Sequence, residues 1–136
     1  MVDDILLNKA DILEKCIRRI HEEYQNDSQN LFTHQTKQDS IILNLKRSCQ
    51  ASIDMAMRKV KLLRLGLPKE SREAFDLLAK AGIIDPHLLQ KMHGLVGFRN
   101  TAIHNYKALD LKVVKAIVEH HLEDFLALSK TLIQSP

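Results

Sequence analysis

Residues 85–106, DPHLLQKMHGLVGFRNTAIHNY, decide the fold of this chain. Asp85 is a residue type that caps helix N-termini, and Pro86 suits the first helical position. The apolar residues that follow recur with helical spacing, namely Leu88, Leu89, Met92, Leu95, Val96 and Phe98. The stretch therefore predicts an amphipathic helix whose C-terminal end carries a cluster of polar residues.

Helical periodicity extends to the N-terminal half of the chain. A first helix is predicted to begin at Asp3 or Asp4 and to end in the turn-forming residues 24–30, YQNDSQN. A second long helix is expected from about 38–39 to 65–66, just before a proline.

The remaining segments complete an all-α protein. Ser71 opens a short helix that Gly82 closes at the C′ position, and Asp110 caps a last helix that reaches Leu128. Because the connections are short, we expect an up-down four-helix bundle with one short additional helix. The whole chain, 1–136, is predicted to be a single helical domain.

Composition excludes several classes of protein. The chain has 20 basic and 17 acidic residues, and a net charge of +3 permits nucleic-acid binding without requiring it. No apolar run approaches the roughly 18 residues of a membrane span, and residues 1–10 do not form a secretory signal. Cys16 and Cys49 suit neither a disulfide framework nor a metal knuckle, so we expect small core residues in a cytoplasmic protein. The histidine spacings predict no metal site, and we expect no cofactor.

The segment GFRNTAIHNY, residues 97–106, combines Arg99, Asn100, His104 and Tyr106. On an ideal helix of about 100° per residue, Arg99 and Tyr106 share a face, whereas Arg99 and His104 point about 140° apart. The arginine and the histidine would therefore converge only where the helix ends or bends. The cap at Asp110 requires a break in or just after this segment.

These residue types suit metal-independent RNA cleavage. Histidine exchanges a proton near neutral pH, so His104 could activate a 2′-hydroxyl or protonate the leaving oxygen. Arg99 could stabilise the charge that builds on phosphorus, with Asn100 as a supporting residue. A single histidine does not readily act as both acid and base, but a symmetric dimer would supply two. The alternative interpretation is a helix end with a solvated arginine and a half-buried tyrosine.

The segment resembles the ribonuclease signature of the HEPN superfamily, in which an arginine and a polar residue precede a histidine. The ending His104-Asn105-Tyr106 resembles the HepT toxin subgroup. This resemblance implies an endoribonuclease that acts as a homodimer, with Arg99 and His104 as catalytic residues. It also implies a toxin of a type VII-like pair, whose partner is an MntA-type nucleotidyltransferase antitoxin. A larger hetero-oligomer with that antitoxin is left open beside the homodimer.

The resemblance further implies control by AMP transfer to Tyr106. An adenylate there would bring negative charge close to Arg99 and would obstruct the RNA path. A free tyrosine hydroxyl is a poor nucleophile at pH 7, so the partner must activate it. The RNA substrate, tRNA or mRNA, is not defined by the sequence.

Two other functions remain open at this point. The bundle could be a non-catalytic nucleotide-binding or substrate-binding subunit of a nucleotidyltransferase complex, or a simple helical adaptor. Gly94 and Gly97 lie inside a helix at a cost of roughly 1 kcal/mol each, which suggests close approach by another helix within the bundle or across a dimer interface. Of the adjacent His120 and His121, one is expected at the core edge and the other in solvent.

Overall fold

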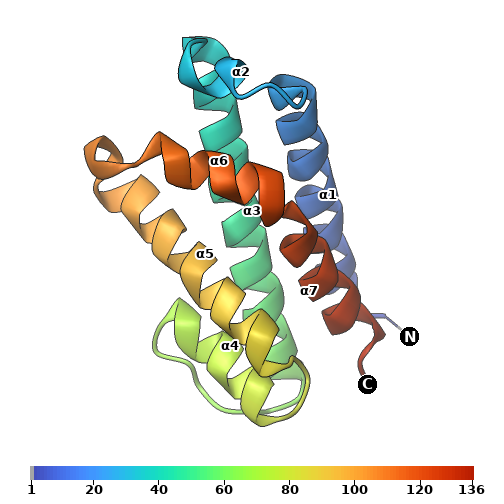
Figure 1. Ribbon diagram of the computed structural model, residues 1–136. Helices are drawn as coiled ribbons and strands as arrows, with labels where there is room; N and C mark the ends of the chain where they lie inside the picture. The colour runs from blue at the N-terminus through green and yellow to red at the C-terminus, as the bar shows by residue number, and fades with distance from the viewer. Residues whose placement is uncertain (1) are drawn as a thin grey trace.

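Two long antiparallel helices form the framework of the fold. The computed structural model describes residues 2–136. In this structure α1 (Asp4–Tyr24) packs along α3 (Gln35–Leu62) (Figure 1). A one-turn helix, α2 (Gln29–Phe32), lies in the connection between them. Ion pairs from α3 to the N-terminal segment reinforce this packing.

The second half of the chain folds against α3 and α1. The short α4 (Ser71–Lys80) follows α3, and α5 (Pro86–His104) then runs back toward the α2 end of the molecule. A one-turn 3-10 helix, η1 (Tyr106–Ala108), leads into α6 (Leu111–His120), which crosses in front of α3 (Figure 1). The last helix, α7 (Leu122–Gln134), returns alongside α1. The predicted all-α, up-down arrangement is confirmed.

The last helix differs from its prediction because it is broken at His121. This residue has a φ of −124° and a ψ of 0°, so the backbone leaves helical geometry between α6 and α7. The ring Nδ1 of His121 lies 2.8 Å from Asp124, and the ammonium of Lys91 lies 3.1 Å from the same buried carboxylate. His120 is exposed and His121 lies at the core edge, as expected.

The predicted helix caps are confirmed where the structure shows a side-chain cap. Asp3 accepts from the backbone of the first turn of α1, and Asp85 does the same for α5 with Pro86 at its start. Asp110 caps α6. Gly82 has a φ of +77° just after α4, a backbone conformation that favours glycine.

The bounds of α3 differ from the prediction at both ends. The helix begins at Gln35, where the ring of His34 accepts from the backbone, and it ends at Leu62. Histidine is not among the preferred capping residues, so the sequence placed the start at the next polar cluster. The one-turn α2 is too short to show a helical period.

The core consists mainly of aliphatic side chains with Phe75 and Phe125 at full burial. Cys16 and Cys49 are buried free thiols, as predicted, and burial raises the pKa of Cys49 to about 12.

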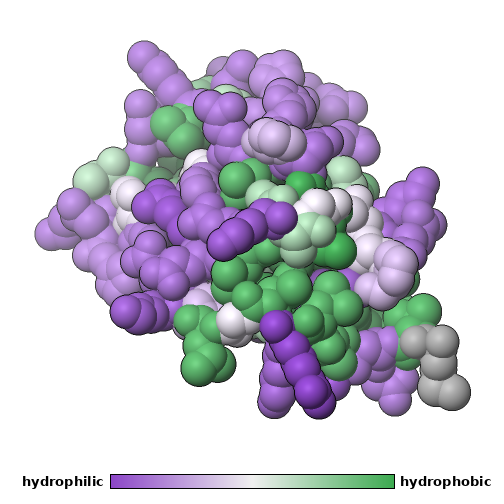
Figure 2. Space-filling view, turned by 90° about the horizontal axis from the view of Figure 1, so that it is seen from below, coloured by the Kyte–Doolittle hydropathy of each residue, from purple (hydrophilic) through white to green (hydrophobic). Residues whose placement is uncertain are grey.

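Hydrophobic side chains also gather on the end of the molecule seen from below (Figure 2). The loop after α3 lies at that end and exposes Leu67 almost fully. This apolar surface is at the opposite end of the bundle from the C-terminus of α5.

Candidate functional site

The polar motif lies where α5 ends. The last helical residue is His104, and Asn105 leaves helical geometry with a φ of −148° and a ψ of 62°. Its N–H still donates to the carbonyl of Thr101 at 2.9 Å, which closes the helix. The chain then enters η1 with Tyr106 as its first residue. The predicted break is therefore present, and it falls just after the histidine.

This position of the break corrects two geometric expectations. Arg99 and His104 both belong to the continuous helix α5, so their side chains leave it about 140° apart, and one copy of the chain does not bring them together. Tyr106 lies beyond the helix, so the shared face with Arg99 that an ideal helix would give does not exist.

Arg99 is half-buried and is held by two neutral amides. Its Nη2 donates to Oε1 of Gln50 on α3 at 2.6 Å, and its Nη1 donates to Oδ1 of Asn100 at 2.9 Å. Its Nε is buried and has no partner among residues 2–136, and no carboxylate in that range forms an ion pair with it. Within the described residues, no acidic side chain therefore compensates the positive charge of this guanidinium, which suits a group that binds anions.

His104, the last residue of α5, and Tyr106, the first residue of η1, are both exposed. Partial burial raises the pKa of the Tyr106 hydroxyl, and the negative charge of Asp39 raises it further. The phenol is therefore neutral at pH 7. The structure thus places an exposed imidazole and an exposed phenol two residues apart.

The contact of Arg99 that the sequence did not predict is the one with Gln50. Gln50 is half-buried on α3 and follows the buried Cys49. Its four-residue spacing from Asp54 indicates that these two side chains are neighbours on the helix, but it does not point to Arg99. The Nε2 of Gln50 donates to Oδ1 of Asp54 at 2.9 Å.

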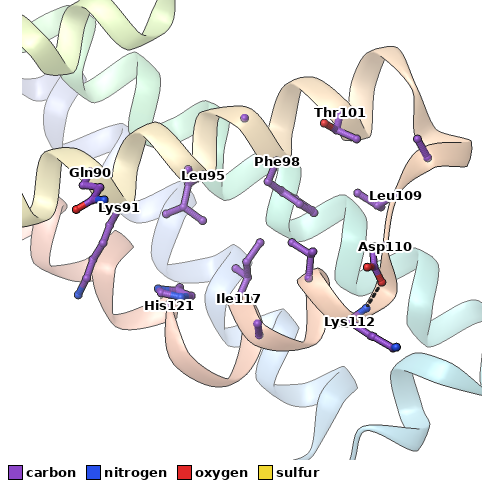
Figure 3. Close-up of a pocket in the computed structure, with 15 residues that line it drawn as sticks. Gln90, Lys91, Leu95, Phe98, Thr101, Leu109, Asp110, Lys112, Ile117 and His121 are labelled. Carbon is purple, nitrogen blue, oxygen red and sulfur yellow. Dashed lines mark hydrogen bonds between the residues drawn. The ribbon is translucent and has the colours of Figure 1, made fainter.

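A groove of about 610 Å³ lies on another side of α5, between this helix and α6 (Figure 3). It is lined mainly by apolar side chains such as Leu95, Phe98 and Ile117, and none of the four motif residues contributes to it. The groove is therefore separate from the polar motif.

The two glycines of α5 also line this groove. A Cβ at Gly94 would meet nothing within 4 Å, so no other helix of the described chain approaches it. A Cβ at Gly97 would lie 2.8 Å from the guanidinium of Arg72, which is the end of a flexible side chain of α4. The suggested close helix approach within the bundle is therefore wrong for Gly94.

Two further properties of residues 2–136 bear on the site. No three side chains of His, Cys, Asp or Glu in this range lie together as a metal-ion set. Within the same range, every helix is too short or too polar to cross a bilayer.

Comparisons with known proteins agree on one family. The model of the family "Ribonuclease HepT-like" matches residues 13–132. The mRNA nuclease HepT of Shewanella oneidensis is 43% identical over 125 residues, which cover 91% of this chain and 92% of that protein. A solved structure of a toxin–antitoxin with AMP-PNP superposes with a TM-score of 0.90 at 40% identity, covering 96% of this chain and 98% of that one.

A second solved structure is of the tri-AMPylated Shewanella oneidensis HEPN toxin in complex with MNT antitoxin. It also gives a TM-score of 0.90 at 40% identity, and it covers 96% of this chain and 97% of that chain. The likeness thus extends over almost the full length in both sequence and fold.

Proposed function

Because this chain belongs to the ribonuclease HepT-like family, we propose that it is an endoribonuclease that cleaves mRNA without a metal ion, the toxin of a type VII-like toxin–antitoxin pair. The observation that carries the proposal is the complete set of Arg99, Asn100, His104 and Tyr106 at the end of α5, with the arginine charge left free. We place its action in the cytoplasm, where mRNA is translated.

The proposed reaction is an attack of the RNA 2′-oxygen on the adjacent phosphorus. A base removes the 2′-hydroxyl proton, the new P–O bond forms, the bond to the 5′-oxygen breaks, and an acid protonates that leaving oxygen. His104 is exposed and can serve as either group, while Arg99 stabilises the charge on the phosphoryl oxygens. Asn100 supports Arg99 through its side-chain oxygen.

The divergence of Arg99 and His104 on α5 supports a homodimer. One copy directs the two side chains to different sides of the helix, so a cleft between two copies would combine an arginine of one with a histidine of the other. The dimer would also supply the second imidazole that acid–base catalysis needs. A larger assembly with the antitoxin would be built on this dimer.

Tyr106 is the proposed point of control by an MntA-type nucleotidyltransferase. Its oxygen would attack the α-phosphorus of ATP, pyrophosphate would leave, and a base of the partner would take the phenolic proton. The exposed position of Tyr106 on a single 3-10 turn, and the raised pKa of its hydroxyl, support a partner that supplies this base. The attached adenylate would add negative charge two residues from His104 and would repel the RNA backbone.

The direct test is cleavage of a defined mRNA by the purified chain in EDTA. We expect cleavage by the wild type and loss of cleavage by His104→Ala. The matched control is His87→Ala, which removes an exposed histidine from the first turn of the same helix. Intact RNA with the wild type, or equal cleavage by His104→Ala, would contradict the enzymatic proposal.

A further inference from the structure

The guanidinium of Arg99 is fixed from α3 by Gln50 rather than by a charged group. We propose that Gln50 is a positioning residue, whose neutral amide orients Arg99 while leaving its positive charge for the RNA phosphate. This inference rests on the proposed function, because it gives Arg99 the role of a phosphate-binding group.

The orientation of the Gln50 amide is determined by its own neighbours. An amide can present either its oxygen or its nitrogen to a partner. Here its Nε2 donates to Oδ1 of Asp54 at 2.9 Å, and this bond turns Oε1 toward Arg99. The other carboxylate oxygen of Asp54 lies 3.0 Å from the ammonium of Lys9 on α1. A continuous chain of contacts therefore runs from α1 through α3 to Arg99 on α5.

Neutrality matters because a carboxylate would compete with the substrate. An arginine paired with a carboxylate forms a strong, often bidentate ion pair, and its charge is then largely compensated. Both acceptors that hold Arg99 are amides, Gln50 and Asn100. The ammonium of Lys9 pairs with the carboxylate of Asp54, so the negative charge of Asp54 is compensated by Lys9 and not by Arg99.

The hydrogen-bond count of Arg99 agrees with an incoming oxyanion. A guanidinium has five N–H donors, of which Nε carries one and each terminal nitrogen two. One donor of Nη2 is used by Gln50, one of Nη1 is used by Asn100, and Nε is buried. One N–H on each terminal nitrogen is left, and such a pair matches two phosphate oxygens.

The decisive experiment compares two substitutions of Gln50 in the full chain. Gln50→Leu keeps the approximate volume but removes the acceptor. Gln50→Glu keeps the shape and the acceptor for Arg99, but it adds a negative charge and replaces the N–H that donates to Asp54 by a second oxygen. We expect each variant to lower kcat for RNA cleavage by about tenfold to a hundredfold, with KM changed by less than about threefold, because misplacing or neutralising a transition-state group mainly affects the chemical step.

A purely structural role predicts a different result for Gln50→Glu. A carboxylate would still accept from Arg99 and so join α5 to α3, and kcat of the folded protein would then stay at the wild-type value even if the lost bond to Asp54 lowers the melting temperature. The control is Gln134→Leu, which changes an exposed glutamine at the end of α7. Asp54→Asn is expected to lower kcat less than Gln50→Leu, because it frees the amide orientation without removing the acceptor. Wild-type kcat in Gln50→Leu or Gln50→Glu would overturn the inference.

A second measurement does not depend on ribonuclease activity. The NMR order parameter of the Arg99 Nε–Hε group, assigned through Arg99→Lys, reports how firmly the guanidinium is held. We expect this order parameter to fall in Gln50→Leu and to stay high in Gln50→Glu. Unchanged order in Gln50→Leu would overturn the positioning role. An inactive wild-type chain with the expected order parameters would instead reject the proposed function alone.

Discussion

Substituting Gly94 by alanine tests whether the apolar groove of α5 is open space in the isolated chain. A methyl group at this position meets nothing within 4 Å among the described residues, and Gly94 lies well inside the helix. Alanine is about 0.5–1 kcal/mol more favourable than glycine in a helix interior. We therefore expect Gly94→Ala to raise the free energy of unfolding by that amount and the melting temperature by about 2–4 °C.

The matched control is Gly82→Ala, because a methyl group there also meets nothing within 4 Å. The φ of +77° at Gly82 disfavours any side chain, so we expect this variant to lose about 1 kcal/mol. Urea unfolding followed by circular dichroism measures both variants, at several protein concentrations that extend to the lowest detectable. A destabilised Gly94→Ala at low concentration would refute the reasoning, since it would mean that the groove is filled.

Three other predictions follow from the described contacts. The hydrogen bond from Arg58 lowers the pKa of Asp3 from 3.8 to about 2. The stabilisation by the ionised Asp3 carboxylate is therefore complete above pH 3.8 and is lost as the pH falls toward 2. Asp3→Asn should flatten the acid-unfolding curve between these two pH values. Phe75→Ala removes a fully buried ring and should cost about 3–5 kcal/mol in urea unfolding, so a loss below 1 kcal/mol would contradict the described core. Tyr106→Phe should retain RNA cleavage but accept no labelled AMP from an MntA-type partner; labelling of this variant would exclude Tyr106 as the sole acceptor.

Local chemistry was sufficient to predict the helical class and the starts of α1, α5 and α6. The side-chain oxygens of Asp3, Asp85 and Asp110 bond to the turn that directly follows each of them, so a short window of sequence contains the whole interaction. The same holds for Gly82, since glycine adopts the left-handed backbone just after α4 without steric cost.

Features that depend on distant residues could not be predicted. The break at His121 is accompanied by a contact between Asp124 on α7 and Lys91 on α5, which are 33 positions apart. Gln50 and Arg99 are 49 positions apart, and nothing in either segment alone identifies the other as its partner. The motif residues themselves were recognisable, but the angle between Arg99 and His104 required the exact end of α5.

The way Arg99 is held has an evolutionary consequence. Among the described residues, Arg99 makes no ion pair and leaves one buried N–H without a partner. Its two amide acceptors are only partly buried, so water can replace Arg99 as their hydrogen-bond donor. An apolar residue at this position would therefore abolish the proposed phosphate binding at little expense to the fold. Under the proposed function, the consequence is a ribonuclease activity that a single mutation can remove while the folded protein remains.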